Sequence, residues 1–304
     1  MPGAKEHLRV VRNHSHIEVQ PAGPGRYAGL RVAAPPTADR EDASGYTNGT
    51  SSAAALASRT AHRIHDALEA TYGGEFLDLS HIERAVILKA LLVHPARWPD
   101  AAASLIRNTI GPSDGRQHVR QKDNIRRFLG FGYVDSEDAV ACAADRATFW
   151  AVGQLRREQV ASISIPIPAA FGGKRRAHTL AATLAWFTPV SPGRRTYRTV
   201  RLRLLEPGSL DDLAVKPSSM QPDGNQTNRG TVFSRVWTGE RAPVVSQNMS
   251  AIVEIQREPD QGAEIDEAVP FGLAVTLAMP GVVEIYDQVR ARLRAARTRT
   301  RLRQ

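Results

Sequence analysis

Cysteine is nearly absent from this chain of 304 residues, in which Cys142 stands alone. A single thiol excludes an internal disulfide, has no second thiol with which to share a metal, and favours a cytoplasmic location. Cys142 lies in the apolar run AVACAA, so we expect a buried structural thiol. The sequence also lacks any run of about 18 apolar residues and the apolar core of a secretory signal, so we expect no membrane partner.

Acidic residues are missing from positions 290–304, which contain seven arginines. Such a run can contact nucleic acid or an acidic partner, but we expect it to be the solvated end of a helix that begins near Val282. No nucleic-acid-binding signature accompanies it, so nucleic acid is not expected as a partner. Metal-ligand spacings of His, Cys, Asp and Glu are missing as well, so we expect neither a metal nor another cofactor.

Two long segments of the first half have helical patterns. From Ser51 to about Thr71 the chain is rich in alanine, and Gly73-Gly74 would end this helix. Ser80 followed by Glu83 has the form of a capping box. The apolar run after it predicts a helix over residues 82–93 that is buried in a large domain. His94 follows this helix directly and is expected to be structural.

Three shorter predictions follow along the chain. Residues 101–108 are expected to form a short helix, and the polar residues 111–124 a surface insertion. The run AVACAADRAT, which begins at residue 139, is again helical in pattern.

After about Phe149 the periodicity changes to the alternation of β-strands. Five runs show it: ASISIPIP, HTLAATLAWF, YRTVRLRLL, NMSAIVEIQRE and PFGLAVTLAM. Proline, glycine, asparagine and aspartate separate these runs, which predicts a β-sandwich or jelly roll. A further short strand is expected from Leu30 to Ala33. We place the boundary between two domains near residues 147–160.

The segment Gly49-Thr50-Ser51-Ser52-Ala53-Ala54-Ala55 runs directly into the first helix. A serine hydroxyl is a poor nucleophile until a base takes its proton. At the first turn of a helix, the N–H of Ser51 and the helix dipole would favour a developing negative charge, and Gly49 would let a substrate approach the backbone closely. The simpler alternative is that Ser51 is only an N-cap.

This segment resembles the one that carries the nucleophile of subtilisin-like serine proteases. Over about residues 25–147 the resemblance includes Val32-Ala33-Ala34-Pro35, the helix LKALLVH and the segment Gly130-Phe131-Gly132-Tyr133-Val134-Asp135. Ala55 stands where that family usually has proline, and Pro36 where it usually has glycine. The runs TLAWFTP and LAVTLAM resemble strands of the jelly-roll domain that follows the protease domain in some of these enzymes.

The resemblance implies three parts of the chain. Residues 1–147 would be the C-terminal half of an α/β domain with a doubly wound parallel sheet. Residues 148–282 would be an all-β jelly-roll or sandwich domain, and residues 283–304 a basic helix or tail. Half of a doubly wound sheet would leave apolar helix faces uncovered, so we expect the helix at 82–93 to lose much of its cover.

The resemblance also implies a serine-type endopeptidase that acts on peptides or proteins. Ser51 would be the nucleophile, and Asn48, Gly49 and Thr50 would contribute to the oxyanion hole and the substrate cleft. Only 50 residues precede Ser51, and they contain nothing like the family segments that carry the triad Asp and His. We therefore expect peptide hydrolysis only if these residues are supplied from elsewhere, and none from this chain alone.

Local histidines are not expected to replace the missing base. His14 and His16 lie upstream in a polar stretch, without the surroundings of the family's catalytic histidine. His62 and His65 lie on the helix of Ser51, three and four turns away, which is too far to reach its hydroxyl.

Two alternatives to an enzyme stay open. The chain can be an inactive protease remnant that binds a partner through its jelly roll, or a β-sandwich binding module in which the serine has no role. The segments LASRTAHRIHDAL, KALLVHPARW and KDNIRRFLGFGYVD are also similar to intracellular bacterial subtilases found beside AAA-type ATPases and connected with anti-phage defence. That similarity implies an ATPase as partner.

Overall fold

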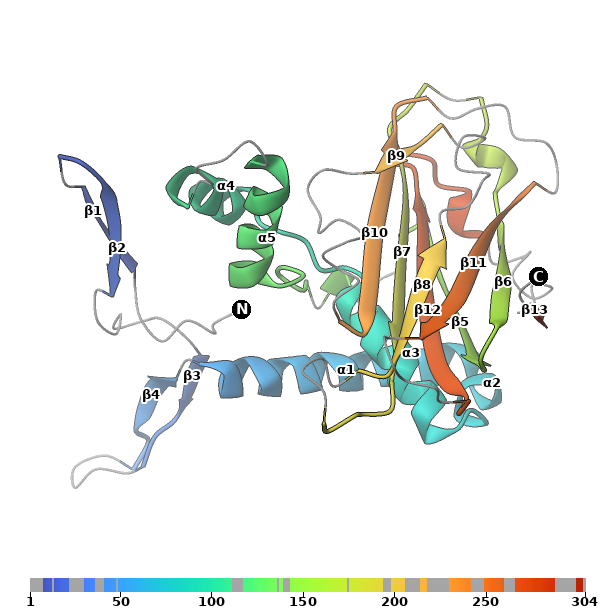
Figure 1. The fold of residues 1–304 in the computed structure, drawn as a ribbon, viewed down its shortest axis with the longest axis horizontal. Coiled ribbons are helices and arrows are strands. Elements are labelled where there is room, and N and C mark those ends of the chain that lie inside the picture. The colour runs from blue at the N-terminus through green and yellow to red at the C-terminus, as the bar shows by residue number, and fades with distance from the viewer. Residues whose placement is uncertain are drawn as a thin grey trace.

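The computed structural model describes most of the chain. The described residues are 8–12, 14–21, 30–35, 41–47, 49–110, 117–135, 137–138, 143–173, 175–193, 198–205, 214–217, 230–241, 249–259, 266–287 and 299–302. Within them, helices lie along one side of a two-layered β-sandwich, and two small hairpins stand at the N-terminal end (Figure 1).

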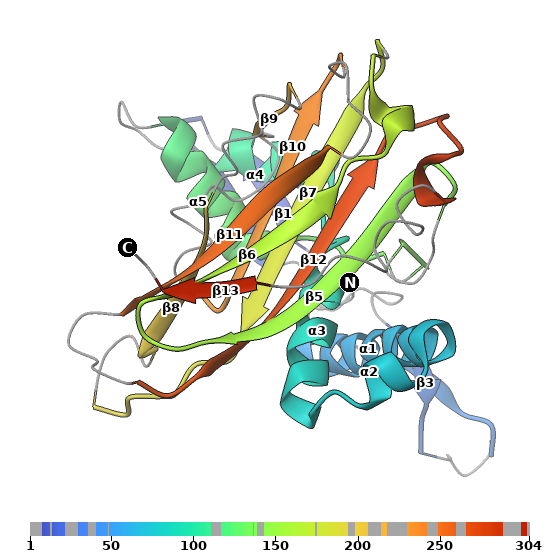
Figure 2. The same ribbon diagram turned by 90° about the vertical axis from the view of Figure 1, so that its right-hand side faces the viewer.

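The sandwich consists of a five-stranded sheet of order β5-β12-β7-β10-β9 and a four-stranded sheet of order β13-β6-β11-β8 (Figure 2). All pairings within both sheets are antiparallel. The strands are β5 (Arg146–Leu155), β6 (Gln159–Pro166), β7 (His178–Trp186), β8 (Val200–Leu205), β9 (Lys216–Pro217), β10 (Val232–Gly239), β11 (Ser250–Pro259), β12 (Val269–Ala278) and β13 (Arg299–Leu302). The five alternating runs correspond to β6, β7, β8, β11 and β12, so the prediction of a β-rich region is confirmed.

The five-stranded sheet is covered on both faces. Along β12, alternate apolar side chains point into the core between the two sheets: Phe271, Leu273, Val275 and Leu277. The residues between them face the helices, where Ala274 joins a second apolar cluster with Ile87 and Leu91. Because both faces of this sheet are covered, β7 and β12 are buried along nearly their whole length.

Among the described residues, five helices precede the sandwich: α1 (Thr50–Tyr72), α2 (Gly74–Leu77), α3 (His81–Val93), α4 (Asp100–Thr109) and α5 (Gln117–Leu129). Helix α3 packs on the outer face of the five-stranded sheet, against β12, β7 and β5. Val86, Ile87 and Ala90 are completely buried there. The expectation that this helix would lose its cover is therefore wrong, because the sandwich itself provides the cover. No described helix is long and apolar enough to cross a bilayer.

The predicted ends of the two main helices are confirmed. Ser80 Oγ accepts a hydrogen bond from the Glu83 N–H at 3.3 Å, and Glu83 Oε2 accepts one from the Ser80 N–H at 2.9 Å, which completes the capping box of α3. Gly73 ends α1 with a φ of 53°, a conformation that glycine adopts without steric cost. The short helix predicted at 101–108 corresponds to α4.

Three predictions of local structure need correction. Part of the expected surface insertion at 111–124 is helix α5, because Ile125 is buried against Trp98 and Ala103. The helix expected from residue 139 does not extend through Arg146, where β5 begins; residues 139–142, including Cys142, lie outside the described residues. In the basic tail at 283–304, the end is not a frayed helix, since β13 pairs with β6.

The parallel sheet that the family resemblance implies is not among the described strand pairs. Before α1 the chain forms two antiparallel pairs, β1 (Leu8–Arg12) with β2 (Ile17–Pro21) and β3 (Leu30–Ala33) with β4 (Ser44–Thr47). Parallel strands need a crossover of a dozen or more residues, usually a helix. The described residues place no helix between these strands, which agrees with their antiparallel pairing.

We expect the replacement Gly272→Ala to destabilise the protein, because a Cβ at this position would lie 2.7 Å from the carbonyl carbon and oxygen of Val86 on α3. Overpacking of this kind typically lowers the free energy of unfolding by about 1–3 kcal/mol. Urea unfolding followed by circular dichroism measures the change. Gly193→Ala is the matched control, since a Cβ there meets nothing within 4 Å. Equal stability of the two variants would contradict a close packing of α3 on β12.

Candidate functional site

Ser51 lies in the first turn of α1, immediately after the β3–β4 hairpin. The N-cap of α1 is Gly49, whose φ of 117° and ψ of 175° are rarely accessible to other residues. No side chain forms a capping hydrogen bond at this end of the helix. The alternative that Ser51 serves only as the N-cap is therefore wrong.

The surroundings of Ser51 leave its hydroxyl and its amide accessible. The side chains of Thr50 and Ser51 are exposed, whereas Ser52 is buried with a relative exposure of 9%. The first hydrogen bond of the helix joins the Ala53 N–H to the Gly49 carbonyl at 3.2 Å. The amides before Ala53 thus have no partner within the helix, as is usual at a helix start, and the Ser51 N–H is a suitable oxyanion donor. Asn48 lies outside the described residues.

No described residue hydrogen-bonds the hydroxyl of Ser51. His62 and His65 lie about 16 Å and 21 Å farther along the helix at its usual rise per residue. They instead form pairs on the surface of α1, with His62 Nε2 3.6 Å from Asp66 Oδ2 and His65 Nδ1 3.7 Å from Glu69 Oε2. The structure therefore keeps both histidines away from Ser51, as the sequence predicts.

The same face of α1 brings three potential metal-ligand atoms, from His65, Asp66 and Glu69, within 4.8 Å of one another. His65 is half-buried and the two acids are exposed. Because carboxylates and histidines at this helical spacing also form ordinary surface pairs, we assign no metal to this cluster.

His14 and His16 lie between strands β1 and β2, and both are exposed. Figure 1 shows that this hairpin stands apart from the start of α1. The structure therefore does not bring either histidine to Ser51.

The region around Ser51 projects from the rest of the protein, as Figure 1 shows. The side chains of Val32 and Tyr46 on the hairpin are 38% and 48% exposed, and Ala54 and Ala55 are exposed on the helix. The other half of α1 packs on the core. The described residues thus leave Ser51 and several nearby apolar side chains exposed.

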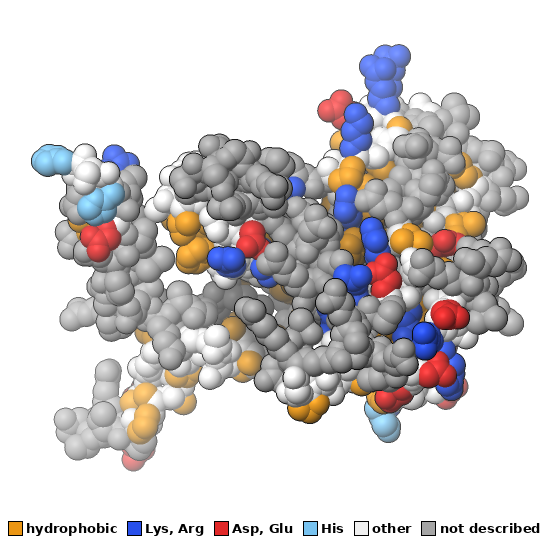
Figure 3. Space-filling view, viewed as in Figure 1, with side chains coloured by type: hydrophobic (Ala, Val, Ile, Leu, Met, Phe, Trp, Pro, Cys, Tyr) orange, Lys and Arg blue, Asp and Glu red, His pale blue; other side chains and the backbone are white. Residues whose placement is uncertain are grey.

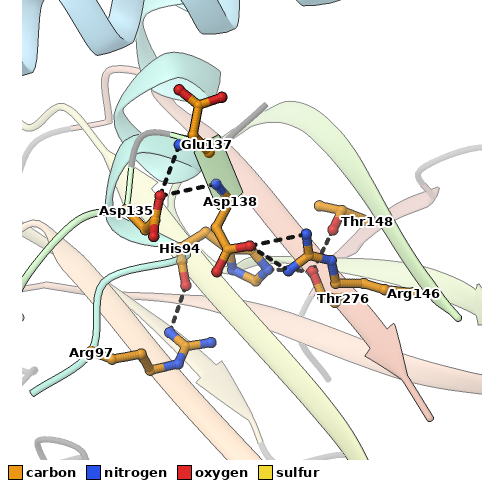
Figure 4. A network of polar contacts seen from close by, with 8 residues as sticks. All are labelled: His94, Arg97, Asp135, Glu137, Asp138, Arg146, Thr148 and Thr276. Carbon is orange, nitrogen blue, oxygen red and sulfur yellow. Dashed lines mark hydrogen bonds and ion pairs between the residues drawn. The ribbon is translucent and has the colours of Figure 1, made fainter. Parts of the chain in front are cut away.

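A second candidate site lies at the opposite end of α1. A pocket of about 440 Å³ is enclosed by the second half of α1, the end of α3 and the outer face of the five-stranded sheet. One part of its lining is apolar, with Ile64, Leu68 and Trp150. The other part is polar, and Figure 4 shows the network of contacts that surrounds it.

His94 lies at the centre of this network and is buried, with a relative exposure of 6%. Its Nδ1 is 2.9 Å from Thr183 Oγ1 on β7, and its Nε2 is 2.7 Å from Thr276 Oγ1 on β12. Burial, together with the positive charges of Arg97 and Arg146, lowers the pKa of His94 to about 3. His94 is therefore neutral near pH 7, and its burial agrees with the structural role expected for it.

The glycine-containing segment after α5 fixes one side of the pocket. Tyr133 pairs with Arg97 through backbone hydrogen bonds of 2.8 Å and 3.0 Å. Gly132, with a φ of 112°, lies so close that a Cβ there would be 2.1 Å from the carbonyl oxygen of Arg97. Trp98 Nε1 donates to the carbonyl of Gly130 at 2.9 Å. This segment is part of the resemblance to subtilisin-like proteases, and in the structure it packs against Arg97 and Trp98.

Asp135 is the last residue of the same segment, and it positions Asp138, which lines the pocket. Its Oδ1 accepts the N–H groups of Glu137 and Asp138 at 2.9 Å and 3.3 Å. Asp138 Oδ1 in turn accepts hydrogen bonds from the Arg146 guanidinium at 3.2 Å and 3.3 Å (Figure 4). The pocket was not predicted from the sequence, since its lining comes from distant segments. The only local signal was the presence of threonines within apolar strand runs, such as Thr183 and Thr276.

Comparisons with known proteins assign no activity. No protein-family model and no solved structure match the chain. A protein named "Uncharacterized protein y4bN" from Sinorhizobium fredii (strain NBRC 101917 / NGR234) is 25% identical over 226 residues, which cover 66% of this chain and 52% of that protein. The chain thus spans about half the length of this relative.

The lowered pKa of His94 predicts how the free energy of unfolding depends on pH. Its pKa is about 3 in the folded protein and near 6.5 in the unfolded chain, so the unfolded state binds its proton first as the pH falls. Its contribution to stability is complete above pH 6.5 and is lost toward pH 3, by up to about 1.4 kcal/mol per pH unit. We expect His94→Gln to flatten this decline in urea unfolding measured from pH 7 to 4. The exposed His62→Gln serves as control, and identical slopes for His94→Gln and the unaltered protein would contradict the assignment.

Proposed function

We propose that this chain supplies the nucleophile-bearing part of a subtilisin-like serine endopeptidase, with Ser51 as the nucleophile. One observation carries the proposal: an exposed serine stands in the first turn of a long helix, directly after a positive-φ glycine and an antiparallel hairpin. This arrangement agrees with the function that the resemblance of the GTS segment implies. It is also the arrangement in which a backbone amide can stabilise an oxyanion.

The proposed reaction is acyl transfer from a peptide to Ser51. A histidine base takes the hydroxyl proton while Ser51 Oγ attacks the carbonyl carbon, and the resulting oxyanion accepts a hydrogen bond from the Ser51 N–H. The protonated base then gives its proton to the leaving amine, and water hydrolyses the acyl-enzyme. Gly49 and Thr50, together with Asn48, would border the substrate. The histidine and its orienting aspartate would come from polypeptide outside the described residues.

Exposed apolar side chains on the β3–β4 hairpin, directly before the helix of Ser51, support this division of the active site. Val32 and Tyr46 are exposed on opposite faces of this hairpin, and burying such a side chain stabilises a complex by about 1.5–3 kcal/mol. We propose that the part carrying the aspartate and histidine covers this hairpin and supplies the parallel sheet.

In the sandwich, successive strands from β5 to β8 alternate between the two sheets, which agrees with a jelly-roll domain. By the same resemblance, the enzyme would act in the cytoplasm with an AAA-type ATPase as partner.

The alternative function is that of an inactive protease remnant that binds through its jelly-roll domain. The pocket on the outer face of the five-stranded sheet favours this alternative, because it is a formed concave site with both apolar and charged lining.

Labelling with a fluorophosphonate probe tests the proposal. The protein is labelled in lysates of its native organism, where all partners are present, and compared with the chromosomal variants Ser51→Ala and Ser58→Ala. Ser58 is exposed on the same helix and is the matched control. We expect labelling that disappears only in Ser51→Ala, because the probe reacts with serines activated by a base. The purified 304-residue chain is expected to remain unlabelled.

The outcomes separate the candidate functions. Ser51-dependent labelling of the purified chain would show that a base lies within these residues, contrary to the proposed division of the active site. Absence of Ser51-dependent labelling in the lysate as well would overturn the endopeptidase and favour the binding alternative.

A further inference from the structure

The pocket next to His94 is formed jointly by α1 and the five-stranded sheet, and it has features of a binding site. Its volume of about 440 Å³ falls within the usual range for small-molecule sites, about 300–1,000 Å³. It is also separate from Ser51, because Ile64, the lining residue of α1 nearest to Ser51 in sequence, lies about 20 Å along the helix at 1.5 Å per residue.

The polar part of the lining carries an excess of positive charge. Arg97 and Arg146 both line the pocket, and Asp138, which is hydrogen-bonded to Arg146, is the one acid among the described lining residues. Glu137 forms its own ion pair with Arg63 at 2.9 Å. Because His94 is neutral, the charged groups of the lining sum to one positive charge.

Neutral donors extend this polar part along the sheet. Thr179 on β7 and Thr238 on β10 are direct cross-strand partners, and both line the pocket. Thr148 Oγ1 lies 2.6 Å from Thr276 Oγ1, next to His94 (Figure 4). Hydroxyls and guanidinium groups are the donors with which proteins bind carboxylate, sulfonate and phosphate oxygens.

The other part of the lining can hold an apolar body. Ile64, Leu68 and Leu91 contribute aliphatic surface from α1 and α3. Trp150 and Tyr72 stand edge to face, with ring centroids 5.3 Å apart, which fixes an aromatic wall. The indole Nε1 of Trp150 is buried and has no hydrogen-bond partner among the described residues.

We propose that this pocket binds a small organic anion, with its acidic group beside Arg146 and its apolar body against Trp150 and Tyr72. The site is independent of the proposed protease chemistry, because it shares no residue with the surroundings of Ser51. Its position between α1 and the sheet means that a ligand would contact both at once.

Two fluorescent probes of nearly equal shape test the proposal. 1-Anilinonaphthalene-8-sulfonate carries a negative charge, and N-phenyl-1-naphthylamine is its uncharged counterpart. We expect saturable one-to-one binding of the sulfonate to the full chain, at least tenfold tighter than that of the neutral probe. Arg146→Gln is expected to weaken sulfonate binding about tenfold and to change neutral binding less than twofold. Arg146→Lys should restore most of the affinity, since it keeps the charge.

Controls connect the binding to this pocket. Arg203→Gln removes an exposed arginine from β8 in the other sheet and should leave both probes unaffected, whereas Thr238→Trp at the edge of the pocket should weaken both. Near-ultraviolet circular dichroism checks that each variant is folded. Equal affinities of the two probes for the unaltered protein, or sulfonate binding that survives Arg146→Gln in a folded variant, would overturn the proposal.

Discussion

The close approach of α3 to β12 determines how the two parts of the structure fit together. Gly272 has no side chain, and the backbone of Val86 occupies the space that a Cβ would fill. At this short separation, Lys89 reaches the end of the central strand β7, where its Nζ donates to the carbonyl of Trp186 at 3.0 Å. Burial lowers the pKa of Lys89 to about 8. One turn beyond Lys89, His94 is inserted against β7 and β12. A larger residue on β12 would move the helix outward and separate all of these contacts together.

Because α3 packs on the sheet, α1 has a buried second half and an exposed first half. Its second half is held against α3 and the sheet through Ile64 and Leu68, and it forms one wall of the pocket. Its first half carries Ser51 and projects without cover from the described part of the chain (Figure 1). In Figure 3, orange apolar side chains are visible along this projecting helix and hairpin, where they are open to contact by another polypeptide. The sandwich therefore fixes the orientation of Ser51 without contributing a group to its chemistry.

The sequence predicted those features that depend on neighbouring residues. The capping box of Ser80 and Glu83 and the five alternating strand runs were recognisable because each is fixed by a spacing of two to four residues. Features that depend on distant contacts were missed. Helix α5 has a polar composition, and it is held by the burial of Ile125 against α4. The cover of α3 by the sheet depends on Gly272, far along the chain, and a glycine within an apolar run gives no indication of its partner.

The same distinction applies to the two candidate sites. The properties that make a serine a candidate nucleophile are local, because Gly49, the helix start and the free amides all lie within a few residues of Ser51. The base that would activate it is a distant contact, and the described residues do not provide one. The pocket is the opposite case, since its lining comes from several elements far apart in the sequence. Arg146, Asp138 and His94 are brought together only by the folding of the chain. The Ser51 site can therefore be recognised from the sequence, although its base cannot. The pocket beside His94 can be recognised only in the folded structure.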